Sequence, residues 1–157
     1  MVGEATARLL EGGCSLIVGA VLDGGEPYAT RGWGMNLLPG QPARARLLLA
    51  ADDTVGAAAL ADGRAIAVTA ADVPSLQSVQ VKGRSLGVTP GTDDDRARAA
   101  RFVDAFFGDI VRTDGTARRV LDRMVPADVV ACTFTIDDLY DQTPGPGAGA
   151  VMPRQAP

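Results

Sequence analysis

Short runs in which apolar and polar residues alternate dominate this chain, and alternation with period two is the pattern of a half-buried β-strand. The β-branched run from Leu16 to Leu22 is typical of a strand that is buried along most of its length. The segment 23–27 that follows predicts a hairpin, because its two glycines accept positive φ without steric cost. Strands are expected over residues 14–22, 28–38, 43–51, 64–71, 76–88 and 128–138.

Helical spacing of apolar residues is found in four other stretches. Residues 2–11 predict a short helix that ends before two glycines, and the oxygens of residues 52–54 can cap a second one over 55–61. Three aspartates at 93–95 complement the dipole of a longer helix that contains Phe102, Phe106 and Phe107. A further helical piece is expected over 116–124. Strands linked by hairpins, with few helices between them, predict a mainly β fold: an antiparallel sheet or barrel with peripheral helices.

The chain of 157 residues shows no internal repeat and no linker. We therefore expect one domain over residues 1–142, followed by a Pro/Gly-rich tail over 143–157 that is irregular. The glycines of the tail do not form a phosphate-binding loop, because the lysine and the following helix that such a loop requires are missing.

Charge and residue usage exclude several classes of function. A net charge of -4 argues against nucleic acid as a partner. The longest apolar run is too short to cross a bilayer and follows no basic segment, so we expect a cytoplasmic protein without membrane association. The chain has no histidine, which excludes Ser-His-Asp and Cys-His catalysis and histidine-ligated zinc. Cys14 and Cys132 are expected as buried free thiols in preference to a disulfide, and no spacing predicts a metal site.

The segment 77–84 is the most informative polar stretch. Its residues Ser78, Gln80, Lys82 and Arg84 share one face of the expected strand, because side chains alternate with period two. Such a face can line a ligand site in which Lys82 holds a phosphate. A solvated strand face explains the same pattern.

The segment 30–36 carries two glycines inside an expected strand. Gly32 and Gly34 indicate a bulge or the close approach of a ligand or another backbone. Arg31 beside them supplies a fixed charge suited to phosphate oxygens. Trp33 is either a stacking surface or part of the core or an interface.

These segments, in this order, resemble the FMN-binding split-barrel family, the pyridoxamine 5'-phosphate oxidase-like proteins. The resemblance covers residues 3–142, with the hairpin glycines, the Arg31 strand, the short helix at Thr54 and the segment 78–83 in matching places. It implies a six-stranded antiparallel split β-barrel that forms a homodimer and holds flavin at the subunit interface.

The resemblance also implies cofactor-binding residues. Arg31 would contact the phosphate or the ribityl chain, and Thr54 would contact the phosphate. Gly32, Trp33, Gly34 and Met35 would lie along the isoalloxazine through their backbone amides. Ser78 and Gln80 would make polar contacts, with Lys82 on the same strand face.

Two departures from the family pattern stand out. Gly56 occupies a position that is basic in many members, and Asp52 and Asp53 precede Thr54, which weakens the phosphate site. The arginine and histidine with which the true oxidases bind pyridoxamine phosphate have no counterpart, so oxidation of vitamin B6 is not expected.

The leading hypothesis is a homodimeric FMN-binding oxidoreductase that acts on a small-molecule substrate, with the cofactor supplying the electron chemistry. A second hypothesis keeps the fold and replaces FMN by a deazaflavin or by haem. A third is a non-catalytic binding protein without a cofactor. The dimer is predicted because open barrel edges and an apolar surface at Trp33, Met35, Leu37 and Leu38 would need covering.

Overall fold

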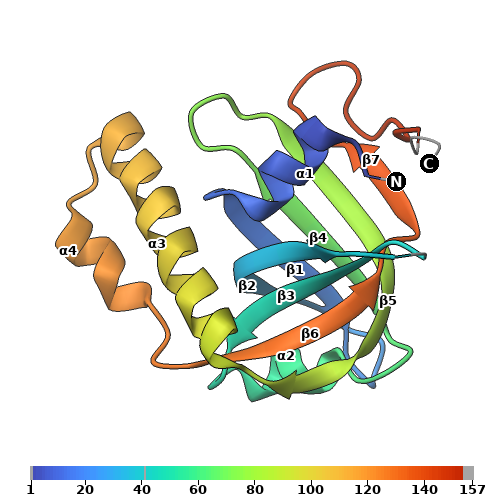
Figure 1. Cartoon of the computed structure of the whole chain (residues 1–157). Coiled ribbons are helices and arrows are strands. Elements are labelled where there is room, and N and C mark those ends of the chain that lie inside the picture. Colours follow the sequence, from blue (N-terminus) through green and yellow to red (C-terminus); the bar gives the residue numbers. More distant parts are fainter. Residues whose placement is uncertain (1, 41, 154–157) are drawn as a thin grey trace.

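Antiparallel strands close on themselves into a barrel in the computed structural model, which describes residues 2–40 and 42–153 (Figure 1). The strands are β1 (Ser15–Val21), β2 (Pro27–Leu38), β3 (Arg44–Ala50), β4 (Ala65–Ala71), β5 (Ser78–Pro90), β6 (Val129–Thr135) and β7 (Asp138–Asp141). The helices are α1 (Glu4–Glu11), α2 (Thr54–Ala59), α3 (Asp93–Asp114) and α4 (Arg118–Leu121), with a 3-10 turn at Asp122–Met124.

The ring follows the order β4-β1-β2-β3-β6-β5, and pairing of β4 with β5 closes it. β7 adds to β5 outside the ring, and every strand pair is antiparallel. The predicted six-stranded antiparallel split β-barrel is therefore confirmed. Because the ring is closed, the open barrel edges expected from the sequence are absent from the six ring strands.

The long strand β5 serves two parts of the barrel in turn. Its first half pairs with β4 from Ser78 to Arg84, and its second half pairs with β6 from Ser85 onward. Gly83 lies at the change of partner, where a Cβ atom would collide with the carbonyl oxygen of Thr135. The absence of a side chain there allows β5 and the end of β6 to approach each other.

The strand expected over 128–138 is two strands in the structure. β6 pairs with β3, and after Thr135 the chain crosses over so that β7 pairs with β5. The crossing is fixed by Ile136 N–H, which donates to Ala43 O at 2.8 Å, and by Asp137 N–H, which donates to Lys82 O at 2.8 Å. Phe134, Ile136 and Leu139 are all buried across the crossing, so the apolar sequence pattern does not reveal it.

Helix α3 begins at the three aspartates, as predicted. Thr92 and Asp95 form a capping box, and Gly115 ends the helix with a φ of 75°. The helical piece expected over 116–124 is shorter, since α4 has four residues and continues as a 3-10 turn that ends before Pro126.

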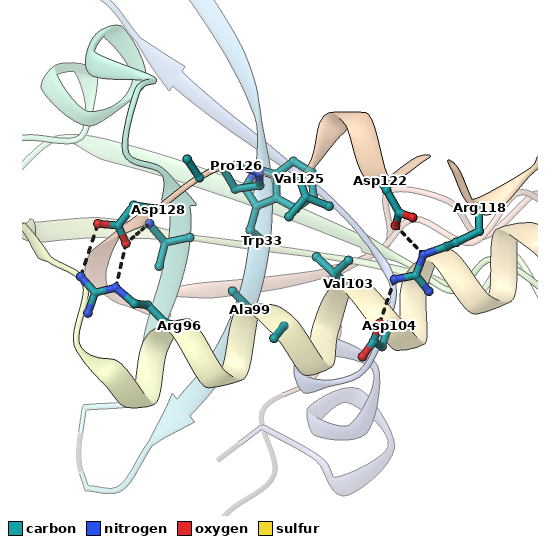
Figure 2. A pocket seen from close by; sticks show the side chains of 13 residues that line it. Trp33, Arg96, Ala99, Val103, Asp104, Arg118, Asp122, Val125, Pro126 and Asp128 are labelled. Carbon is teal, nitrogen blue, oxygen red and sulfur yellow. Dashed lines mark hydrogen bonds and ion pairs between the residues drawn. The ribbon is translucent and has the colours of Figure 1, made fainter. Parts of the chain in front are cut away.

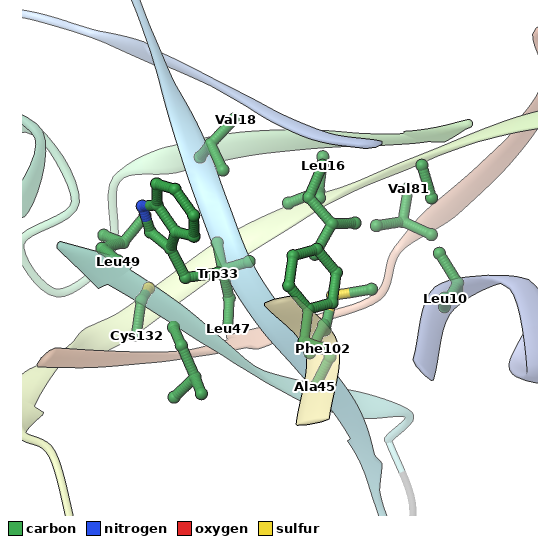
Figure 3. Close-up of a cluster of buried hydrophobic side chains, with 14 of the residues drawn as sticks. Leu10, Leu16, Val18, Trp33, Ala45, Leu47, Leu49, Val81, Phe102 and Cys132 are labelled. Carbon is green, nitrogen blue, oxygen red and sulfur yellow. The ribbon is translucent and has the colours of Figure 1, made fainter. Parts of the chain in front are cut away.

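The hydrophobic core has two layers (Figure 3). One fills the barrel with alternate residues of its strands, such as Leu16, Leu47 and Val81. The other lies between the outer side of β2 and β3 and the helix α3, where Phe102 and Phe107 are buried. Apolar side chains therefore pack on both sides of β2 and β3. No helix covers the outer side of β1 and β4 (Figure 1).

The tail returns along β7 after a turn. Asp141 N–H donates to Ala150 O at 2.9 Å, and Met152 N–H donates to Leu139 O at 2.8 Å. A bridge between Tyr140 and Val151 belongs to the same pairing. Residues 154–157 of the expected irregular tail lie outside the described residues. Within the described part of the chain, no helix combines the length and apolar character needed to span a membrane.

Candidate functional site

One outer face of the barrel, formed by β5, β4, β1 and β2, brings polar residues from distant segments together. The register places Arg31 opposite Ile17, Ile17 opposite Thr69, and Thr69 opposite Gln80. Paired residues in adjacent strands share a face, so these four side chains form one row across the sheet. The neighbouring row consists of Ala29, Gly19, Ala67 and Lys82. We call this surface the outer face.

Arg31, Gln80 and Lys82 thus share the outer face; the alternation of side chains predicts this for Gln80 and Lys82, which belong to one strand. Gln80 Nε2 donates to Thr69 Oγ1 at 2.9 Å, which fixes the amide across two strands. Lys82 is exposed, and its Nζ lies 4.6 Å from the centroid of the Tyr140 ring. That cation–π contact holds the lysine against β7 while its charge stays accessible to a ligand.

A shallow apolar hollow of about 630 Å³ lies beside Lys82 on the outer face. Its floor is made of small residues, among them Gly19, Ala65 and Ala67. Side chains this small leave the strand backbones accessible to a planar group or to a second protein surface. Ile17 and Val21 remain 44% and 46% exposed on the same face.

Arg31 lies where the outer face meets helix α3. Its guanidinium carbon is 5.9 Å from the ring centroid of Trp33 and 5.6 Å from that of Phe106. Within the described residues, Arg31 forms no ion pair and donates no side-chain hydrogen bond. The rings orient the guanidinium without neutralising it, which is the arrangement that an anionic ligand requires.

The bulge indicated by Gly32 and Gly34 is present, and it sends consecutive residues of β2 to different sides. The register with β3 shifts by one residue between Gly32 and Met35. A Cβ atom on Gly32 would press on Leu16 and Leu47 inside the barrel, where Met35 is also buried. Trp33 lies against Phe107 of α3, with the rings edge-on at 6.4 Å.

The buried positions of Trp33 and Met35 change the argument for a dimer. Trp33 is 5% exposed and Met35 is 1% exposed, so neither contributes to the apolar surface that the sequence predicted. Helix α3 covers Trp33, and the barrel interior encloses Met35. Leu37 and Leu38 are half-buried, and the exposed large apolar residues of the outer face are Ile17 and Val21.

The remaining candidates, Ser78 and Thr54, are less available to a ligand. Ser78 is buried, and its Oγ donates to Leu76 O at 2.9 Å. Thr54 is exposed at the start of α2, but the Asp53 carboxylate already occupies that helix end by accepting from Gly56 N–H at 2.8 Å. Partial burial of Asp53 opposes its ionisation, but hydrogen bonds, among them those from Gly56 N–H and Tyr28 O–H, outweigh this and hold its pKa below the usual value.

Sequence reasoning did not select Ile17, Thr69 and the small residues between them. The sequence does contain a signal for this surface, because strand β4 carries only alanine and threonine on the face opposite its buried residues. Recognising it required knowledge of which strands are neighbours.

The outer face offers charge and hydrogen bonds but no thiol nucleophile. Cys14 and Cys132 are free and buried, as predicted. Burial, reinforced by the charge of Asp72, raises the pKa of the Cys14 thiol to about 12. Among residues 2–40 and 42–153, no group of three or more His, Cys, Asp or Glu side chains is arranged to hold a metal ion.

The barrel, with its two-part strand β5 and the helix α3 packed on β2, defines the split-barrel fold of the FMN-binding, pyridoxamine 5'-phosphate oxidase-like proteins. Solved structures share it. HupZ of Group A Streptococcus superposes with a TM-score of 0.58 at 15% identity, over 95% of this chain and 100% of that one. An F420 reductase superposes with a TM-score of 0.54 at 17% sequence identity, over 88% of this chain and 98% of that one.

A putative pyridoxamine 5'-phosphate oxidase from Lactobacillus delbrueckii gives a TM-score of 0.53 at 18% identity, over 88% of this chain and 93% of that one. No protein-family model matches the sequence, and no curated protein matches it. At these identities the likeness establishes the fold.

Proposed function

We propose that this chain binds FMN on the outer face, at the interface of a homodimer, and acts as a flavin-dependent oxidoreductase on a small-molecule substrate. The observation that supports this proposal most directly is the outer face itself. There Arg31 of β2 lies in one row with Gln80 of β5, and Lys82, also on β5, borders a shallow apolar hollow.

The residues present fit a flavin. The small side chains of Gly19 and Ala67 leave room for a flat ring system, and Lys82 adds a positive charge at the border of the hollow. The guanidinium of Arg31, which the aromatic rings orient, suits a phosphate group. In this proposal Gln80 supplies a polar contact, and residues 32–35 contribute only through backbone amides, of which those of residues 33 and 34 lie in the bulge outside the regular pairing with β3.

Ser78 and Thr54 take minor roles in the proposal. The Ser78 hydroxyl already donates to a backbone carbonyl, and Thr54 follows two aspartates that would repel a phosphate. Arg31 therefore supplies most of the binding energy for the phosphate.

A second copy of the chain would complete the site. The hollow is open to solvent, so one protomer would leave one side of a bound ring exposed to water. The apolar side chains of Ile17 and Val21 border the same face and would be covered by the same contact. A two-fold arrangement joins identical patches in this way.

The flavin, when bound, supplies hydride or electron transfer to and from the substrate. The chain itself would bind and orient the cofactor, keep water from one side of it, and place the positive charge of Lys82 beside it. Because no protein nucleophile is needed for this chemistry, the absence of histidine from the sequence is compatible with it.

The identity of the cofactor is tested by purifying the protein, recording its absorbance and identifying the released cofactor by mass spectrometry, before and after incubation with FMN. Oxidised-flavin absorbance and stoichiometric FMN would support the proposal. Release of a deazaflavin would favour the alternative suggested by the structural likeness to an F420 reductase. A haem Soret band would favour the haem alternative. A colourless protein that binds neither FMN nor F420 nor haem would contradict all three cofactor hypotheses. The non-catalytic binding protein would then be the remaining hypothesis.

A further inference from the structure

A second pocket, of about 380 Å³, lies outside the barrel, between helix α3 and the segment that leads into β6 (Figure 2). Helix α3 forms one wall, and the segment from α4 to the start of β6 forms the other. Its lining is mostly apolar and includes Trp33, Ala99, Val103, Val125, Pro126 and Val129. Pockets of this size and composition accept small organic molecules.

Two ion-paired arginines hold the walls together. Arg96 Nε is 2.9 Å from Asp128 Oδ1, which ties the start of α3 to the start of β6. Arg118 reaches Asp104 on α3 at 2.8 Å and Asp122 at 2.7 Å (Figure 2). The pocket is therefore bounded by elements that ion pairs connect.

These pairs also determine which charge a ligand can carry. Three carboxylates, of Asp104, Asp122 and Asp128, face two guanidinium groups in the lining. Both guanidinium groups are already engaged. An anionic ligand would have to break an existing ion pair or approach excess negative charge, so the pocket disfavours anions.

Trp33 supplies a hydrogen-bond donor on the apolar wall. Its ring is 5% exposed and is oriented by the edge-on contact with Phe107. Among the described residues, none accepts a hydrogen bond from the indole Nε1–H, whose edge lies beside Pro126 in Figure 2. The indole nitrogen is not among the described side-chain atoms that are both buried and unpartnered, so its N–H keeps some accessible surface and can donate to a ligand.

We propose that this pocket binds a small, neutral, planar aromatic compound whose carbonyl oxygen accepts a hydrogen bond from Trp33 Nε1–H. The apolar walls would hold the ring, the indole would orient the carbonyl, and the acidic excess would exclude carboxylates. The lining shares no residue with the hollow beside Lys82, although Arg31 of the proposed flavin site contacts the Trp33 ring, and the pocket would exist in a protein that binds no flavin.

The chain contains one tryptophan, so a proton–nitrogen correlation NMR spectrum has a single indole signal that reports this site without further assignment. We would titrate the protein with three probes of similar shape: para-fluoroacetophenone, para-fluorotoluene and para-fluorobenzoate. Binding would be followed by the indole signal and by fluorine NMR of each probe. The ketone should move the indole proton downfield, the toluene should bind more weakly, and the benzoate should not bind.

Two matched variants locate the binding. Ala100→Phe fills the pocket from α3 and should weaken binding of the ketone by about tenfold or more. Ala97→Phe adds the same ring at an exposed position of α3 outside the lining and should leave binding unchanged. Trp33→Phe keeps the aromatic wall and should reduce the affinity for the ketone to that for the toluene.

The proposal is overturned if saturating ketone leaves the indole signal unmoved, or if Ala100→Phe and Ala97→Phe bind it equally. Tighter binding of the benzoate than of the ketone would also contradict it. Each variant's native fold is checked by its amide NMR spectrum, and a variant that unfolds is replaced by Ala100→Leu, which fills the same space less completely.

Discussion

The Asp95 carboxylate receives two hydrogen bonds from Arg46, from Nε at 2.9 Å and from Nη2 at 2.6 Å. The pair connects β3 of the barrel to the first turn of α3. Asp95 also accepts from the Thr92 N–H at 2.9 Å and so completes the capping box. One carboxylate therefore both starts α3 and fixes it to the sheet that it covers, which also fixes the wall of the second pocket.

Replacing Asp95 by Asn should lower the free energy of unfolding by about 3 kcal/mol, the lower part of the range for breaking a buried pair, because the Arg46 side chain keeps some contact with solvent. Urea denaturation at neutral pH measures this loss. Asp93→Asn, which removes an exposed ion pair on the same helical turn, should leave the stability unchanged. Equal stability of both variants would show that the pair does not hold α3 in place.

The same pair predicts a pH dependence. The Arg46 hydrogen bonds hold the pKa of Asp95 well below its usual range, whereas burial alone would raise it. The carboxylate thus stabilises the fold fully above its unfolded-state pKa of about 4 and loses that contribution as the pH falls through the folded-state value. Urea denaturation at several acidic pH values should show stability falling more steeply in the wild type than in Asp95→Asn. Stability that falls equally steeply with pH in the wild type and in Asp95→Asn would contradict the prediction.

Most of the fold followed from local sequence patterns. The hairpin at Gly25, the helix start at Asp93 and the alternation in β4 each depend on neighbours in sequence, and the structure shows all three. The separation of β6 from β7 could not be predicted, because Phe134, Ile136 and Leu139 are buried on both sides of the crossing. The partner strand changes there without a change in the apolar pattern.

The candidate site was predictable only within each strand. Period two correctly places Gln80 and Lys82 on one face, yet nothing local in the sequence places Arg31 in the same row as Gln80. The burial of Trp33 depends on helix α3, which lies about 70 residues further along the chain and packs on the bulge. Tertiary packing therefore decides which residues of the segment 30–36 face a ligand.

Replacing Arg31 by Ala should weaken FMN binding by about ten- to a hundredfold, since a charge-assisted contact to phosphate contributes roughly 1.5–3 kcal/mol. Flavin fluorescence titration measures the affinity, and circular dichroism checks the fold. Arg101→Ala removes an exposed arginine from α3 and serves as the control, with no expected change. Unchanged affinity in Arg31→Ala would remove the arginine from the proposed site.

Replacing Ile17 by Asp should convert the proposed dimer into a monomer, because it places a charge in the middle of the apolar surface that the second copy would cover. Light scattering at micromolar concentration measures the mass. Val120→Asp changes an equally exposed apolar residue on α4 and should leave the mass unchanged. A wild-type protein that is monomeric under these conditions would contradict the shared-interface proposal, whatever its affinity for flavin.

Lys82 is the only lysine of the chain, and its charge is held at the border of the hollow by the ring of Tyr140. Lys82→Met keeps most of the aliphatic stem and removes the charge. A cation beside a flavin favours its anionic reduced form, so the variant should have a more negative midpoint potential. Its FMN affinity should fall by roughly fivefold, because an exposed ionic contact contributes up to about 1 kcal/mol.

Spectroelectrochemistry of the bound flavin measures the potential, and Lys82→Arg, which keeps the charge, should retain the wild-type value. The two substitutions separate charge from packing, because both replace the lysine but only the methionine removes its positive charge. If Lys82→Met and the wild type have the same potential and the same affinity, the lysine extends into water from the strand and takes no part in the site. If both variants shift the potential equally, the contact with Tyr140, and not the charge, determines the effect.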